Sequence, residues 1–154
     1  MDRVDAAKRS AIMRSVRSKD TKPEMALRSA LHARGLRFRL HAKLLPGRPD
    51  IVLPRWRACI FVHGCFWHRH GCSMTTTPKS NFEFWNAKFA ANQDRDRRAV
   101  EALSGSGWRA LTVWQCGLTG NGSVEACATF VMDWLSGSNS VSEYPPTASP
   151  ANHA

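Results

Sequence analysis

The spacing of apolar residues along the chain predicts a domain in which helices and strands alternate. Helical spacing covers residues 21–35, 80–103 and 124–135. Strand-like runs, either alternating or continuously apolar, cover residues 36–40, 51–53, 58–62 and 108–114. The run at 108–114 is apolar on both faces, which is typical of a strand covered on both sides. We therefore expect an α/β domain, with a small mixed sheet flanked by helices.

Two of the predicted helices begin with capping-box sequences. Thr21-Lys22-Pro23-Glu24 precedes the first, whose apolar side is expected to hold Met25, Leu27, Ala30 and Leu31 before Gly35 ends it. Ser80-Asn81-Phe82-Glu83 opens the second in the same way. The hairpin at 51–62 lies between them and is expected to form an antiparallel pair.

The distribution of polar residues suggests three regions. Residues 1–20 are rich in charged and small residues and are expected to form a basic arm with a short helix. Residues 21–136 carry the periodic apolar pattern of a folded domain. Residues 137–154 contain mainly Ser, Asn, Pro and Ala and are expected to be a disordered tail.

Positive charge is concentrated at one end of the chain. The 154-residue sequence has a net charge of +10, and half of its 22 Lys and Arg residues lie in the first 40 positions. A basic arm is a common means of binding nucleic acid phosphates. A solvated surface and membrane-surface binding remain alternatives, although the second usually needs a stronger aromatic face. No export signal or bilayer-length apolar run is seen, so we expect an intracellular protein.

Four residues have the chemistry of a metal site. Cys65, His70 and Cys72 lie within eight residues, and Cys116 follows the last predicted strand. Zinc prefers four Cys or His ligands in a tetrahedron, and disulfides are rare inside cells. We predict a structural zinc at these residues; the alternative is buried thiols and exposed histidines. The other two cysteines, Cys59 and Cys127, lie in apolar segments and are expected in the core.

Asp50 is a candidate ligand for a catalytic metal. It follows Pro49 and enters the predicted hairpin, a layout that resembles the PD…(D/E)xK nucleases, in which acids hold Mg²⁺. A Pro-Asp pair is also common in turns. Phe61-Val62-His63 stands where that pattern has Asp/Glu-x-Lys, so a backbone carbonyl and a histidine would have to replace the second acid and the lysine.

The long helix carries two polar residues on its apolar stripe. Phe82, Trp85, Phe89, Val100 and Leu103 share one side with Asn92 and Asp96. A buried carboxylate is costly unless it is paired, so Asp96 is expected to contact a histidine, a metal or an arginine. The alternative is a rotated stripe with Asp96 in solvent.

Phe66 and Trp67 lie between two of the proposed zinc ligands. Exposed rings beside basic residues suit stacking on bases or insertion between base pairs. From the residues alone, a place in the core is equally open for both rings.

Together these segments resemble the very-short-patch repair endonuclease family. The resemblance runs from about Arg9 to Leu135 and is carried by LPGRPD at 45–50, IFVHGCFWH at 60–68, EFW at 83–85, RDRR at 95–98, GWR at 107–109 and VWQC at 113–116. It implies a restriction-endonuclease-like (PD-(D/E)xK-type) mixed sheet flanked by helices, with a structural zinc site.

The resemblance also implies roles for individual residues. Asp50 would be the main Mg²⁺ ligand and the Val62 carbonyl the second, while His68 would be the general base or its positioner. His63 and Asp96 would support that site. The zinc ligands would be Cys65, His70, Cys72 and Cys116. Residues implied to contact DNA are Met13 from the minor groove, Phe66, Trp67 and Trp85 as a wedge from the major groove, and Lys88 and Asn92.

The implied activity is a Mg²⁺-dependent nick in double-stranded DNA, 5′ to the thymine of a T:G mismatch left by deamination of 5-methylcytosine. A monomer that acts on chromosomal DNA in the bacterial cytoplasm, with downstream repair proteins as possible partners, would fit this activity. Two other functions are open: a zinc-braced DNA-binding protein without catalysis, which would not need Mg²⁺ to bind, and an RNA-processing nuclease, which should tolerate single strands.

Overall fold

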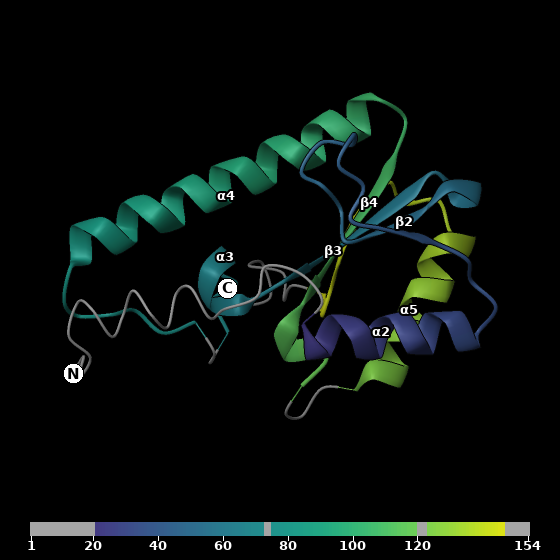
Figure 1. Cartoon of the computed structure of the whole chain (residues 1–154), viewed down its shortest axis with the longest axis horizontal. Coiled ribbons are helices and arrows are strands. Elements are labelled where there is room, and N and C mark those ends of the chain that lie inside the picture. Colours follow the sequence, from purple (N-terminus) through teal and green to yellow (C-terminus); the bar gives the residue numbers. More distant parts are fainter. Residues whose placement is uncertain (1–20, 73–74, 120–122, 147–154) are drawn as a thin grey trace, which may run out of the picture.

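A computed structural model describes residues 21–72, 75–119 and 123–146, which form a five-stranded mixed sheet with helices on both faces (Figure 1). The strand order is β1-β2-β3-β4-β5. The strands are β1 (Arg39–Leu40), β2 (Ile51–Leu53), β3 (Ala58–His63), β4 (Arg109–Trp114) and β5 (Val141–Tyr144). The first two pairings are antiparallel, and β3 with β4 and β4 with β5 are parallel. The predicted mixed α/β architecture is confirmed.

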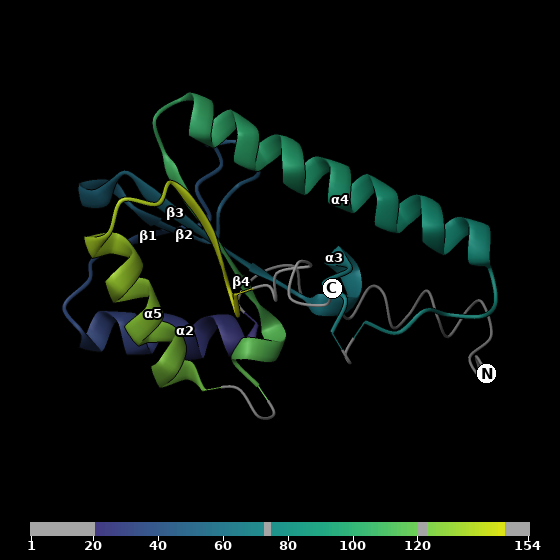
Figure 2. The ribbon, with the colours of Figure 1, turned by 180° about the vertical axis from the view of Figure 1, so that it is seen from behind.

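Two layers of helices cover the sheet. Helices α2 (Lys22–Ala33) and α5 (Val124–Ser136) pack on one face, and α4 (Phe82–Gly105) lies on the other (Figures 1 and 2). Strand β3 alternates accordingly, with Ala58 and Ile60 in the core under α2 and α5 and Cys59 and Phe61 in the core under α4. Helix α4 extends beyond the sheet, and the short helix α3 (Cys65–His68) lies beneath the extension.

Helix α2 begins as predicted but buries a different set of residues. The Thr21 hydroxyl accepts the Glu24 N–H, while the Glu24 carboxylate pairs with Arg28 instead of returning to the cap. Met25 is 50% exposed, so its assignment to the apolar side is wrong. Glu24 takes that place and is only 2% exposed, because its stripe continues through the fully buried Leu27 and Leu31.

Helix α4 does not start with the predicted capping box. Its N-cap, Asn81, has a left-handed backbone (φ 56°) and its side chain makes no capping hydrogen bond. Phe82, expected on the buried stripe, is 57% exposed, whereas Trp85, Phe89, Asn92 and Leu103 are buried. The first turn of α4 lies beyond the sheet, which leaves Phe82 without a core to enter (Figure 1).

The expectation of a disordered tail from residue 137 is wrong for Val141–Tyr144, which form β5. This strand has little apolar content, but its backbone pairs with β4 and the Tyr144 ring packs on Phe130. Arg109 also fixes the preceding turn by donating to the carbonyls of Leu135 and Asn139. Residues 1–20 and 147–154, which include Met13 and most of the remaining predicted tail, lie outside the described residues. Among the described helices, none has the length and apolar character needed to cross a membrane.

The loop before Asp50 depends on a glycine. Gly47 has a positive φ of 75°, and a Cβ there would lie 2.5 Å from the Ala99 Cβ and 3.0 Å from the Phe61 ring. Gly47→Ala should therefore lower the free energy of unfolding by about 2–4 kcal/mol, from left-handed strain and overpacking together. Denaturant titration measures this loss.

Gly35→Ala is the matched control for this substitution. Gly35 also has a positive φ, 91°, but a Cβ there would meet no atom within 4 Å. The control should lose only the strain contribution, about 1 kcal/mol. Equal losses in the two variants would show that the loop does not pack on α4 as described.

Candidate active site and metal centre

Asp50 lies where the loop enters β2, and the hairpin holds its side chain against β3. The Asp50 carboxylate accepts the Val62 N–H at 2.7 Å, and the side chain is 15% exposed. Burial raises the pKa of Asp50 from its ordinary 3.8 to about 7. The Val62 hydrogen bond opposes this shift, and the negative charge of Glu24 adds to it. A cation beside this carboxylate would favour its ionised form.

Glu24 and His41 join Asp50 in a cluster that was not predicted from the sequence. The possible ligand atoms of these three residues lie within 4.8 Å of one another. His41 Nε2 is 3.5 Å from the Glu24 carboxylate and 3.1 Å from the Arg28 guanidinium. The buried Glu24 and half-buried Asp50 carboxylates lie side by side, an arrangement that suits a hard divalent cation, which prefers oxygen ligands.

One signal could have revealed Glu24. It shares the helical spacing of Leu27 and Leu31, and a charged residue on such a stripe suggests a buried partner, as it did for Asp96. The capping box accounted for Glu24 locally and so hid its tertiary role. His41, in an irregular loop with φ 50°, carried no comparable signal.

Asp96 meets two histidines that come from different elements. His68 on α3 places its Nδ1 2.5 Å from the Asp96 carboxylate, and His63 Nε2 on β3 lies 3.9 Å from the same group. The two imidazoles stack at 3.9 Å with planes 4° apart. The expectation that Asp96 contacts a histidine is confirmed.

This arrangement gives the two histidines different properties. An ionised carboxylate can only accept a hydrogen bond, so the Asp96 contact favours the His68 tautomer that carries its proton on Nδ1 and has its lone pair on Nε2. Burial, and next the neighbouring His68, lower the pKa of His63 to about 3. His63 is therefore neutral, while His68 is suited to act as a base with Asp96 behind it.

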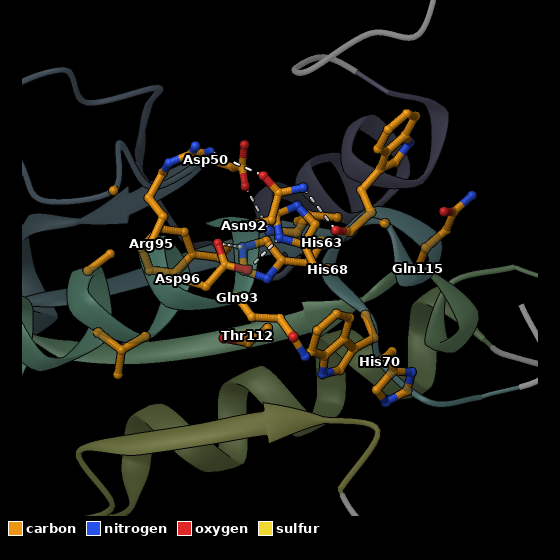
Figure 3. Close-up of a pocket in the computed structure, with 18 of the residues that line it drawn as sticks. Asp50, His63, His68, His70, Asn92, Gln93, Arg95, Asp96, Thr112 and Gln115 are labelled. Carbon is orange, nitrogen blue, oxygen red and sulfur yellow. Dashed lines mark hydrogen bonds and ion pairs between the residues drawn. The ribbon is translucent and has the colours of Figure 1, made fainter. Parts of the chain in front are cut away.

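Both clusters line one cavity of about 1330 Å³ between the sheet and α4 (Figure 3). Figure 3 shows Asp50 on one side and His63, His68 and Asp96 together on the other. Cationic side chains also line this cavity, from Lys43, Arg48, Lys88, Arg95 and Arg97. This cavity offers carboxylates that could bind a metal ion, and it is also lined by Lys and Arg side chains. Such a combination suits a polyanionic substrate.

A second cluster of possible metal ligands lies at α3 and the segment that follows it. The possible ligand atoms of Cys65, His70, Cys72 and Cys116 all fall within 4.8 Å of one another. The His70 Nδ1 lies 3.6 Å from the Cys65 sulfur and 3.4 Å from the Cys116 sulfur. A zinc tetrahedron with ordinary bond lengths has nitrogen–sulfur edges of about 3.6 Å. These residues therefore fit a tetrahedral metal ion.

The surroundings of the four ligands also suit a metal. Helix α3 supplies Cys65, and the 3₁₀ turn η2 (Gln115–Gly117), which follows β4, supplies Cys116. The Cys116 N–H donates to the Cys65 sulfur at 3.4 Å. Burial raises the pKa of the Cys65 thiol to about 12. A metal cation bound among the sulfurs would lower this pKa. Cys59 and Cys127 are fully buried in the two apolar clusters, as predicted.

An aromatic cluster joins α3 to the N-terminal half of α4. Phe66 packs edge-on against Trp67, Trp85 and Phe89 at centroid distances of 5.0, 5.7 and 5.3 Å. Phe66 and Trp67 are half-buried, whereas Trp85 is only 4% exposed. The structure thus brings two of the three predicted wedge residues to the surface and places Trp85 beneath them.

The two remaining DNA-contact candidates differ in exposure. Lys88 is exposed at the edge of the cavity. Asn92 is buried, and its side-chain amide donates to the Trp67 carbonyl at 3.0 Å. In this structure Asn92 holds the backbone of Trp67 in place.

Comparison with known proteins gives a consistent result. The family model described as DNA mismatch endonuclease Vsr matches residues 1–74. The type II nicking enzyme V.XorIIP of Xanthomonas oryzae is 51% identical over 132 residues, covering 86% of this chain and 97% of that protein. The DNA mismatch endonuclease Vsr of Escherichia coli is 43% identical over 135 residues, covering 86% of both chains. The type II nicking enzyme V.NmeAIP of Neisseria meningitidis is 41% identical over 112 residues, covering 73% of this chain and 80% of its own. With this identity over most of its length, the chain belongs to the Vsr family of DNA mismatch endonucleases.

Proposed function

We propose that this protein nicks one strand of duplex DNA 5′ to the thymine of a T:G mismatch, and so begins very-short-patch repair. Family membership supports a DNA endonuclease. The observation that carries the proposal is the single cavity in which buried carboxylates face a histidine base, with cationic side chains around them. A DNA-binding protein without catalysis would have no need of this arrangement.

Asp50 and the Val62 carbonyl are the proposed Mg²⁺ ligands. The N–H and carbonyl of one strand residue point to the same side of the strand, so the Val62 carbonyl is directed toward the side on which Asp50 accepts the N–H. Mg²⁺ bound there would neutralise charge on the scissile phosphate. Glu24 supplies from α2 the second carboxylate that β3 lacks, which supports a variant of the restriction-endonuclease-like fold.

His68 is the proposed general base. Its Nε2 takes the proton of the attacking water, the water oxygen bonds to phosphorus, and the bond from phosphorus to the leaving sugar oxygen breaks as that oxygen takes a proton from a solvent water. Asp96 stabilises the resulting imidazolium through the 2.5 Å contact with Nδ1. The neutral His63 ring, stacked on His68, keeps that imidazole in its plane.

Phe66 and Trp67 form the proposed wedge in the major groove. A wobble pair stacks less firmly than a matched pair, so inserting rings beside it costs less, and deformability contributes to specificity. Trp85 would join them only after leaving its buried place; its indole N–H has no partner among the described residues. Lys88 and the basic arm 1–20 with Met13 complete the proposed DNA contacts, and Asn92 would support them by holding the Trp67 backbone. We propose that the enzyme works as a monomer on chromosomal DNA in the bacterial cytoplasm.

A structural zinc is proposed at Cys65, His70, Cys72 and Cys116. All four positions of the tetrahedron are filled by protein, so the ion would brace the fold and take no part in the reaction. It would hold α3, and therefore His68 and the wedge, against the end of β4.

The zinc proposal predicts about one zinc ion per chain in purified protein. Cys72→Ala or Cys116→Ala should lose the metal and melt at a much lower temperature, because binding energy at a structural site is folding energy. Cys127→Ala is the control, since this thiol lies in the apolar core and should leave the zinc content unchanged. Folded wild-type protein without zinc in elemental analysis would refute the assignment.

The catalytic proposal predicts that Asp50→Ala abolishes nicking of a T:G duplex while mismatch affinity stays within a few fold of wild type. His68→Ala should lose roughly 10²–10⁴ in rate, as expected for a missing acid–base group. Asp94→Ala removes an exposed carboxylate that is paired with Arg98 on α4, and it should nick at the normal rate. Single-turnover assays with labelled duplexes measure all three variants, and normal cleavage by Asp50→Ala would place the active site elsewhere.

The wedge proposal predicts different losses of DNA affinity for substitutions at two residues that line the cavity. Trp67→Ala should lose on the order of 1–3 kcal/mol of binding, mainly on mismatched DNA and with an unchanged salt slope. Lys88→Ala should weaken matched and mismatched duplexes alike and make the salt slope shallower by about 1. Titrations of both duplexes at several salt concentrations compare the variants. Equal loss of Trp67→Ala binding on both duplexes would show that this ring does not sense the mismatch.

A further inference from the structure

Trp114 lies between the metal centre and the catalytic histidines. The parallel register of β3 and β4 pairs His63 with Trp114, so their side chains are neighbours on the cavity face of the sheet. The two rings meet edge-on at 5.5 Å, with planes 69° apart. On its other side the indole stacks on His70 at 4.4 Å, with planes 12° apart.

These contacts form a continuous series of rings. His70 offers Nδ1 to the cysteine sulfurs, Trp114 covers the His70 ring, and His63 joins Trp114 to His68. His68 in turn contacts Asp96. Figure 3 shows His70 apart from the close pair of His63 and His68. The orientation of the Trp114 indole therefore constrains both centres at once.

Glu143 on β5 fixes that orientation. The register of β5 pairs Glu143 with Thr112, which places its side chain on the same face as Trp114 two residues on. The Trp114 indole N–H donates to the Glu143 carboxylate at 3.1 Å. A hydrogen bond to a charged acceptor is stronger than a neutral one, and both residues are half-buried, so the ring is held against rotation.

We propose that Trp114, held by Glu143, is a positioning residue that aligns His63 and His68 for catalysis and braces the zinc-ligating His70. The proposal rests on the proposed function of the same site. In this proposal β5 contributes to the activity indirectly, because its Glu143 acts through Trp114. Partners that orient metal ligands or catalytic groups commonly change activity by tenfold or more when they are removed.

The test is a set of substitutions that separate the hydrogen bond from the ring. Glu143→Ala removes the acceptor and Trp114→Phe removes the donor, and each should lower kcat on the T:G duplex on the order of tenfold. The double variant should be no slower than either single variant, because both remove the same interaction. KM, mismatch affinity and zinc content should stay at wild-type values. Glu143→Gln keeps an acceptor and should restore kcat to within about twofold of wild type.

A readout besides activity tests the metal side. Trp114→Leu removes the ring from His70 and should release zinc to a chelator several times faster than wild type, as expected for a lost outer partner of a metal ligand. Glu125→Ala is the matched control: it removes an exposed carboxylate that pairs with Arg34 and belongs to α5, on the sheet face opposite α4, and it should change neither measurement. Glu143→Ala retains the backbone pairing of β5, so it tests the proposal even if a Trp114 variant does not fold.

Three results would overturn the proposal: unchanged kcat in Glu143→Ala, losses that add in the double variant, or losses confined to KM. These are distinct from failure of the proposed function, in which the wild-type protein itself would not nick the mismatched duplex.

Discussion

The parallel pairing of β3 with β4 is the constraint on which the rest of the site depends. Parallel strands end at the same edge of a sheet, so the segments that follow them meet there. Beyond His63 the chain turns into α3 with Cys65, and beyond Trp114 it turns into η2 with Cys116. Cys65 and Cys116, which are 51 residues apart in the sequence, thus come within contact distance. The same edge brings His63 beside Trp114 and presents His68 to the long helix that connects the two strands.

A second constraint is the pairing of buried charge. The negative charge of Glu24 raises the pKa of Asp50, while the Val62 N–H and the charge of His41 lower it, and Glu24 itself pairs with Arg28. Asp96, by contrast, is matched by His68. In the proposed function the first pair of carboxylates lies at the metal site, while Asp96 contacts a histidine. The two clusters line one cavity, so the proposed hydrolysis would have its metal ligands and its general base on the same substrate.

The sequence predicted the parts whose signals are local. The hairpin at 51–62, the strand at 108–114 and the last helix follow from apolar spacing. Cys65, His70 and Cys72 stood out by their proximity along the chain, and Cys116 by its place after the last predicted strand. Asp96 was found because a carboxylate on an apolar stripe needs a partner. Glu24 was missed because a capping role explained it, and β5 because an edge strand held by backbone hydrogen bonds needs few apolar residues. Trp85 shows a different limit: an aromatic residue at helical spacing fits a core and a wedge equally well, and only packing distinguishes them.

Helix α3 concentrates in four residues the groups that hold metal, contact bases and move a proton in the proposed function. Cys65, Phe66, Trp67 and His68 are consecutive, and one helical turn leaves little freedom for one side chain to shift without the others. The Asn92 bond to the Trp67 carbonyl and the Asp96 contact to His68 then tie this turn to two neighbouring turns of α4. Movement of the wedge rings against a base pair would therefore be transmitted to His68 through rigid backbone. A mismatch would admit the rings and a matched pair would resist them, so His68 would be positioned differently against the phosphate in the two duplexes. Recognition would thus be linked to cleavage without a separate conformational switch.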